Sequence, residues 1–256
     1  MASQRKGERG QIEERSKREQ RADRILDAAA ELMLRWGYNK TTIDDIARQA
    51  GVAKGTIYLH WKTREDLFTS LMKREYIRLA EDIQQRISGD PEGGTLPGLT
   101  KHSMLATMKS PLMKAVLLRD TDLLGEWMRK EYSSASYSEQ VTQSLALFEL
   151  LSRLGGVRDD LDVHRQAYML SAITMGFLVI DQYMPDDFKY SDEEVVEMMT
   201  ESIKRTFAPT PPSAPQPDEH TKQELSNTLV SYLDDVMAIR NRAVQTDQTD
   251  QEGVSS

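Results

Sequence analysis

Residues 41–62 read Thr-Thr-Ile-Asp-Asp-Ile-Ala-Arg-Gln-Ala-Gly-Val-Ala-Lys-Gly-Thr-Ile-Tyr-Leu-His-Trp-Lys, and this stretch decides the fold. Thr41 or Thr42 can cap a helix, because each has an aspartate three residues later, as in a capping box. The apolar residues of the following turns recur at helical spacing and are Ile43, Ile46, Ala47 and Ala50. The pattern therefore predicts a short helix with one buried face.

A tight turn and a second short helix follow. Gly51 can adopt the left-handed conformation that ends a helix, and Val52 then fills the corner. The second helix is expected over about residues 53–60, with Ile57 buried. Two short helices joined by a glycine turn describe a helix-turn-helix, whose second helix fits the major groove of DNA. A helical hairpin inside an all-α core is the alternative.

Several strings in this region resemble the N-terminal signature of the TetR family of bacterial transcription regulators. They are Thr41-Thr42-Ile43, Ile46-Ala47, Ala50-Gly51-Val52, Gly55-Thr56-Ile57-Tyr58 and Trp61-Lys62-Thr63-Arg64-Glu65-Asp66-Leu67-Phe68. The resemblance covers about residues 18–70. Three residues depart from it: Ala53 replaces the usual Ser, Leu59 replaces a polar or aromatic residue, and Trp61 replaces the usual Phe.

The distribution of charge agrees with a DNA-binding head. The 256 residues carry a net charge of −8, but residues 1–64 hold 14 Lys and Arg against 9 Asp and Glu. The head is therefore at +5 and the remainder at −13. The chain has no cysteine, which excludes disulfides and thiolate zinc sites and fits a cytoplasmic protein. The first residues are charged and polar, so no signal peptide is expected.

The head is predicted to contain three helices over residues 18–63. Residues 1–17 lack hydrophobic periodicity and predict a disordered arm, whose basic residues either touch DNA or remain solvated. A helix over about residues 17–36 would brace the helix-turn-helix. The expected DNA-binding residues are Lys40, Thr42, Lys54, Gly55, Thr56, Tyr58, His60 and Lys62.

Residues 64–207 predict a helical ligand-binding and dimerisation domain. A helix over about 63–87 would be a rod of about 36 Å that links it to the head. A Pro- and Gly-containing loop follows over 88–98, and three or four helices over 99–155 break at Pro111 and near Asp120–Asp122. Flexible thioethers and aromatic rings suit an adaptable pocket, although methionine also simply fills cores. The candidate ligand-binding residues are Met104, Met108, Trp127, Phe148, Met175 and Phe177.

The last two body helices are expected to form a subunit interface. The first is capped by Asp160 or Asp162 and runs to about Met184; the second is capped by Ser191 and runs to about Phe207. The first is apolar on nearly all sides but too short to span a membrane. The resemblance implies that this pair forms a four-helix bundle across a two-fold axis, although burial within one chain is the alternative. A Pro-rich linker (208–218), an amphipathic helix (219–244) and a disordered tail (245–256) complete the chain.

The sequence contains no catalytic motif. It has no phosphate-binding glycine loop, no nucleophile elbow and no His-Glu-x-x-His pair, so we expect neither an enzyme nor a metal or cofactor site. We predict an all-α, homodimeric regulator, most simply a repressor released from a pseudo-palindromic DNA operator by a small, largely apolar effector. Two alternatives are a DNA-binding regulator controlled by a protein partner and a helical enzyme with a vestigial head.

Overall fold

The structure is a computed structural model that describes residues 2–132, 145, 148–152 and 156–209, and all regular elements in these ranges are helical. The linker beyond residue 209, the predicted helix 219–244 and the tail 245–256 lie outside them. The chain divides into two compact units. The head unit comprises Met1–Glu75 and Arg119–Met128, and the body unit comprises Tyr76–Leu118 and Arg129–Ser256. This division differs from the predicted one at residue 63.

Helix α1 spans Ala2–Trp36, so the predicted disordered arm is wrong. The helix ends where expected, at Trp36 before Gly37, whose φ is 78°. The arm is rich in Gln, Glu, Lys and Arg, which are good helix formers. A helix of such residues needs no apolar stripe, which is why hydrophobic periodicity failed to reveal it.

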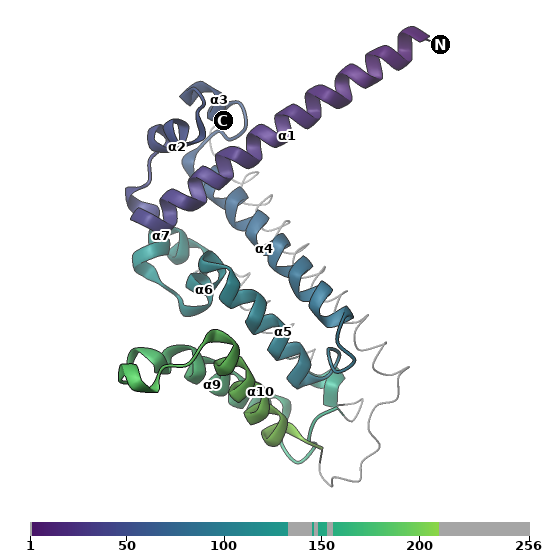
Figure 1. Ribbon diagram of the computed structural model, residues 1–256, viewed down its shortest axis with the longest axis vertical. Helices are drawn as coiled ribbons and strands as arrows, with labels where there is room; N and C mark the ends of the chain where they lie inside the picture. Colours follow the sequence, from purple (N-terminus) through teal and green to yellow (C-terminus); the bar gives the residue numbers. More distant parts are fainter. Residues whose placement is uncertain (1, 133–144, 146–147, 153–155, 210–256) are drawn as a thin grey trace, which may run out of the picture. The chain divides into compact units, whose positions relative to one another are not determined.

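The helix-turn-helix forms as predicted and lies beside the carboxyl-terminal half of α1 (Figure 1). A short 3-10 turn, η1 (Tyr38–Lys40), leads into α2 (Ile43–Ala50), and α3 (Lys54–Tyr58) follows. Helix α3 is shorter than the predicted 53–60. Ile25 of α1, Ile46 of α2 and Ile57 of α3 are completely buried, so the three helices share a core.

A segment distant in sequence completes the head unit. Helix α4 (Arg64–Ser88) begins in the head unit and ends in the body unit, with bounds within one residue of the prediction. Helix α7 (Thr121–Tyr132) also crosses the boundary, and its part within Arg119–Met128 belongs to the head unit. We call Arg119–Met128 the α7 segment. No local pattern predicted that this segment packs there, because long-range contacts leave no such pattern.

The body unit is built from α5 (Leu96–Lys109), α6 (Pro111–Leu118), α9 (Val163–Val179) and α10 (Asp192–Phe207). Two 3-10 turns, η2 (Ile180–Gln182) and η3 (Asp186–Phe188), join α9 to α10. Helix α5 begins inside the predicted loop, because Thr95 caps it and proline is tolerated in a first turn. Figure 1 shows α9 and α10 side by side, and α10 also packs against α5.

Local capping signals predicted where α9 and α10 begin, but α9 ends at Val179, before the predicted end near Met184, because the chain continues as the 3-10 turn η2. Asp162 caps α9, and Ser191 and Glu194 form a complete capping box at α10. The breaks after Lys109 and Leu118 fall at the predicted positions. Within the described ranges, no helix combines the length and the hydropathy needed to cross a membrane.

Candidate nucleic-acid interface

Thr42, rather than Thr41, begins the helix-turn-helix. The Asp45 backbone N–H donates to the Thr42 hydroxyl at 3.2 Å, and that hydroxyl donates to the Asp45 carboxylate at 2.6 Å. The hydrogen bond from the Thr42 hydroxyl, and then one from the Thr42 backbone, lower the pKa of the Asp45 carboxyl. Thr41 is buried instead, and its hydroxyl donates to the Gly37 carbonyl at 2.9 Å. Thr42 therefore fixes the start of α2 on an exposed surface.

Gly51 sets the angle between the two short helices. It has φ 65° and ψ 38°, the left-handed conformation that the sequence predicted. The Val52 backbone N–H then donates to the Ala47 carbonyl at 3.0 Å, which closes the turn. This backbone geometry sets the direction in which α3 leaves α2.

Helix α3 presents an exposed surface over a single buried anchor. Ile57 is completely buried, whereas Tyr58 is 47% exposed and Leu59 is 73% exposed. A side chain at Gly55 would meet no atom within 4 Å, so the backbone is open to an approaching partner there. Ala53 makes no side-chain cap, as expected from the loss of the usual hydroxyl.

The predicted DNA-binding residues all lie in α2, α3 and their flanks, and none is buried. The exposed ones are Lys40, Thr42, Lys54, Gly55, Tyr58 and Lys62. Thr56 and His60 are partly buried. Burial and the positive charges of Arg18 and Arg21 lower the pKa of His60, which favours its neutral form.

Lys54 is engaged in an ion pair on this surface. Its ammonium lies 2.9 Å from the Asp44 carboxylate, and both side chains are at least half exposed. The hydrogen bond to Asp44 and the charge of that carboxylate raise the pKa of Lys54. A DNA phosphate would have to replace Asp44 as the partner of Lys54. Because exposed ion pairs contribute little free energy, this exchange is easy.

Arg64 holds the connection between α1 and α2, a role that the sequence reasoning missed. Its guanidinium donates to the backbone carbonyls of Thr41, at 2.9 Å, and Tyr38. It also lies over the Tyr38 ring, 4.1 Å from the centroid. Burial is the main reason that the pKa of Tyr38 is raised. The first residue of α4 therefore fixes the loop that enters the helix-turn-helix.

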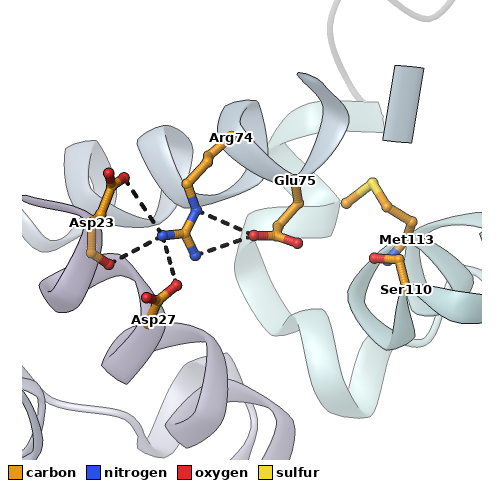
Figure 2. Close-up of polar contacts among 6 residues, drawn as sticks. All are labelled: Asp23, Asp27, Arg74, Glu75, Ser110 and Met113. Atoms are coloured by element: carbon orange, nitrogen blue, oxygen red, sulfur yellow. Dashed lines mark hydrogen bonds and ion pairs between the residues drawn. The ribbon is translucent and has the colours of Figure 1, made fainter. Parts of the chain in front are cut away.

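Arg74 joins α4 to α1 further along the head unit. Figure 2 shows its guanidinium between Asp23 and Asp27 of α1 and the neighbouring Glu75. The nearest carboxylate oxygens of Asp27 and Glu75 lie at 2.8 and 3.1 Å, and that of Asp23 lies at 3.9 Å. The Arg74 and Glu75 side chains are 13% and 15% exposed, whereas Asp23 and Asp27 are more than half exposed. This pairing fixes α4 against the helix that braces the interface.

The candidate ligand-binding residues do not all come together. Five of them belong to one core cluster of the body unit or pack against it: Met104, Met108, Phe148, Met175 and Phe177. Trp127 is 7% exposed, but it belongs to the α7 segment of the head unit. Residue type alone did not separate the core of the body unit from the core of the head unit.

Comparisons with known proteins identify the helix-turn-helix. Residues 25–71 match the profile described as "Bacterial regulatory proteins, tetR family". The fatty acid metabolism regulator protein of Bacillus subtilis is 46% identical over 66 residues, which are 24% of this chain and 34% of that protein. The matches span between 28% and 50% of the length of the first three curated relatives.

Two solved structures share the wider fold. NalD, the secondary repressor of the MexAB-OprM multidrug efflux pump in Pseudomonas aeruginosa, matches with a TM-score of 0.53 and 22% identity, covering 75% of this chain and 98% of that chain. The transcriptional regulator FadR from Bacillus subtilis, in complex with stearoyl-CoA, matches with a TM-score of 0.50 and 23% identity. The match covers 70% of this chain and 96% of that chain.

Proposed function

This chain belongs to the TetR family of bacterial regulatory proteins, and we propose that it regulates transcription as a homodimer that binds a pseudo-palindromic operator. The observation that carries the proposal is α3, which presents an exposed surface from a short helix anchored only by Ile57. Such a helix has the right diameter for the major groove. Like the solved relative that is named a repressor, the protein would repress its genes from the bacterial cytoplasm.

The residues of the interface divide into two roles under this proposal. Lys40 and Lys62 flank the helix-turn-helix and would bind neighbouring phosphates, while Thr42 would donate its hydroxyl to a third. Lys54, Thr56 and His60 would face base edges, with Tyr58 against the backbone. Gly55 would let the sugar-phosphate chain approach α3 closely, because no side chain intervenes.

The exposed aromatic residues of the body unit support a homodimer. Tyr168 on α9 and Tyr183 after it are 78% and 76% exposed, and Phe188 and Tyr190 before α10 are 59% and 53% exposed. Apolar rings in contact with water favour burial against a partner. We assign a second copy of this chain as that partner, so that two heads face successive major grooves.

The effector would be a small, largely apolar molecule held in the body unit. Support comes from the core cluster around Met104 and Phe148, which unites five candidate residues. It also comes from the solved relative whose ligand is stearoyl-CoA. The molecule would lower operator affinity by binding better to the conformation that cannot span the operator.

Selection of binding sites from random duplex DNA tests the proposal. The full chain should enrich an inverted repeat, and its affinity for that repeat should fall steeply with salt. Lys62→Gln should weaken binding, whereas Lys109→Gln, an exposed lysine of α5 in the body unit, should not. Failure to enrich any sequence above background would end the DNA-binding proposal.

A further inference from the structure

Helix α1 extends well beyond the part of the chain that matches the family. The match begins at residue 25, whereas α1 begins at Ala2. The helix therefore runs for roughly 35 Å before the matched domain, at 1.5 Å per residue. Figure 1 shows this amino-terminal half of α1 continuing past α3. Any function of this half is additional to the helix-turn-helix itself.

Two arginines of this extension stand on the face of α1 that turns toward the helix-turn-helix. Arg18 precedes Ile25 by seven residues, and Arg21 precedes Ala28 by seven, which places each pair on one side of the helix. Ile25 and Ala28 are buried at 0% and 5% exposure, but Arg18 and Arg21 are exposed. The face that forms the core therefore becomes basic where the core ends.

The contacts of Arg18 confirm this orientation. One of its guanidinium nitrogens, Nη2, lies 3.5 Å from the carbonyl oxygen of Leu59, the residue that ends α3. The charges of Arg18 and Arg21 also reach His60, the next residue along the chain. The Arg18 guanidinium therefore lies beside the carboxyl end of the helix proposed to enter the major groove. Arg21 follows Arg18 by three residues, so it stands one turn further along the same side of α1.

We propose that Arg18 and Arg21 together bind one phosphate of the operator strand that passes the carboxyl end of α3. The proposal rests on the proposed function, and it extends the DNA interface onto α1 beyond the family's matched domain. The partner is a phosphodiester because two adjacent guanidinium groups favour an anion, and their planar donors suit paired contacts to phosphate oxygens. Leu59 and Tyr58, both exposed beside them, would face the sugar and base surfaces.

Methylphosphonate substitution locates the phosphate. An operator selected with the full chain is prepared with one neutral methylphosphonate at each position of a half-site and its flank. For the wild type, one position beside the α3 carboxyl end should weaken binding about tenfold, because a single charge-assisted contact is lost. In Arg18→Gln/Arg21→Gln that position should have no effect, and the slope of log affinity against log salt should be shallower by about one.

The control variant removes the same charge from the same unit. Arg35→Gln/Lys73→Gln changes two exposed residues, one on α1 seventeen residues beyond Arg18 and one on α4. It should keep the wild-type response to the methylphosphonate. In the free protein, Arg18→Gln/Arg21→Gln should also raise the pKa of His60 by NMR titration, which confirms the placement without DNA.

The outcomes separate this inference from the proposed function. If the wild type selects no sequence, the proposed function fails. If the wild type selects an operator but the two double variants respond alike to every methylphosphonate, the α1 contact is wrong and the helix-turn-helix interface stands.

Discussion

Gly125 and Asn39 meet so closely that a methyl group on the Cα of Gly125 would lie 2.6 Å from the Asn39 Oδ1. Gly125 interrupts α7 with φ 53° and ψ −135°, a conformation open to glycine alone. Gly37, beside Asn39, has φ 78°, and a methyl group there would lie 2.9 Å from the Asp122 carbonyl oxygen. One glycine on each side thus lets the α7 segment dock on the loop between α1 and α2.

Gly125→Ala should destabilise the protein by about 1–3 kcal/mol, the usual cost of a forced backbone conformation. The free energy of unfolding from urea titration measures it. Adding Asn39→Ala removes the crowding but leaves the backbone strain, so the double variant should recover only a minor part of the loss. Full recovery would mean that crowding, rather than φ and ψ, requires the glycine.

Gly55→Ala should preserve the stability of the fold but weaken operator binding. A methyl group at Gly55 meets nothing within 4 Å, and alanine is the better helix former by up to about 1 kcal/mol, so stability should be unchanged or higher. Operator affinity should nevertheless fall about tenfold if DNA approaches the backbone there, as measured by fluorescence anisotropy. Unchanged affinity would remove Gly55 from the interface.

Asp44→Asn should strengthen DNA binding severalfold. The substitution frees Lys54 from its 2.9 Å ion pair and removes a negative charge from the same surface. Lys54→Gln should do the reverse and reduce the salt slope by about one. Because both groups are exposed, thermal denaturation should show little change in either variant, so the effects report on DNA contact alone. Equal weakening by both substitutions would contradict this assignment.

Local chemistry explains what the sequence could predict. Thr42, Gly51, Asp162 and Ser191 act within a turn of their own position, and each ends or begins a helix as expected. The predicted start of α1, near residue 17, was wrong because hydrophobic periodicity cannot detect a helix that has no apolar stripe. The exposed surface of α3 followed from the buried position of Ile57.

Long-range packing explains what the sequence could not predict. The guanidinium contacts of Arg64 reach back 23 and 26 residues, to Thr41 and Tyr38. Trp127 was predicted to bind the ligand only because it is an aromatic residue within residues 99–155. Its place in the head unit depends on the docking of the α7 segment at Gly37 and Gly125, which no local spacing reveals.

The capping box of α10 should make the stability of the body unit depend on pH. Hydrogen bonds from the Ser191 backbone and hydroxyl lower the pKa of Glu194 below its usual 4.5. A lowered pKa in the folded state stabilises the fold above the unfolded value, and this contribution disappears as the pH falls through the folded value. Glu194→Gln should therefore lose less stability than the wild type between about pH 5 and pH 2 in urea titrations. Parallel pH profiles for the two proteins would contradict this role.

Assembly should depend on the exposed rings of α9 and the segment after it. Tyr168→Lys/Tyr183→Lys places two charges where rings that are 78% and 76% exposed would be buried in a dimer. Burying an unpaired charge is strongly unfavourable, so sedimentation velocity should show a shift from dimer to monomer at micromolar concentration. Tyr58→Lys makes the same chemical change on α3 and should leave the dimer intact. The monomeric double variant should then bind a single half-site weakly, because it loses the second head, and a wild-type protein that sediments as a monomer would refute the two-fold arrangement.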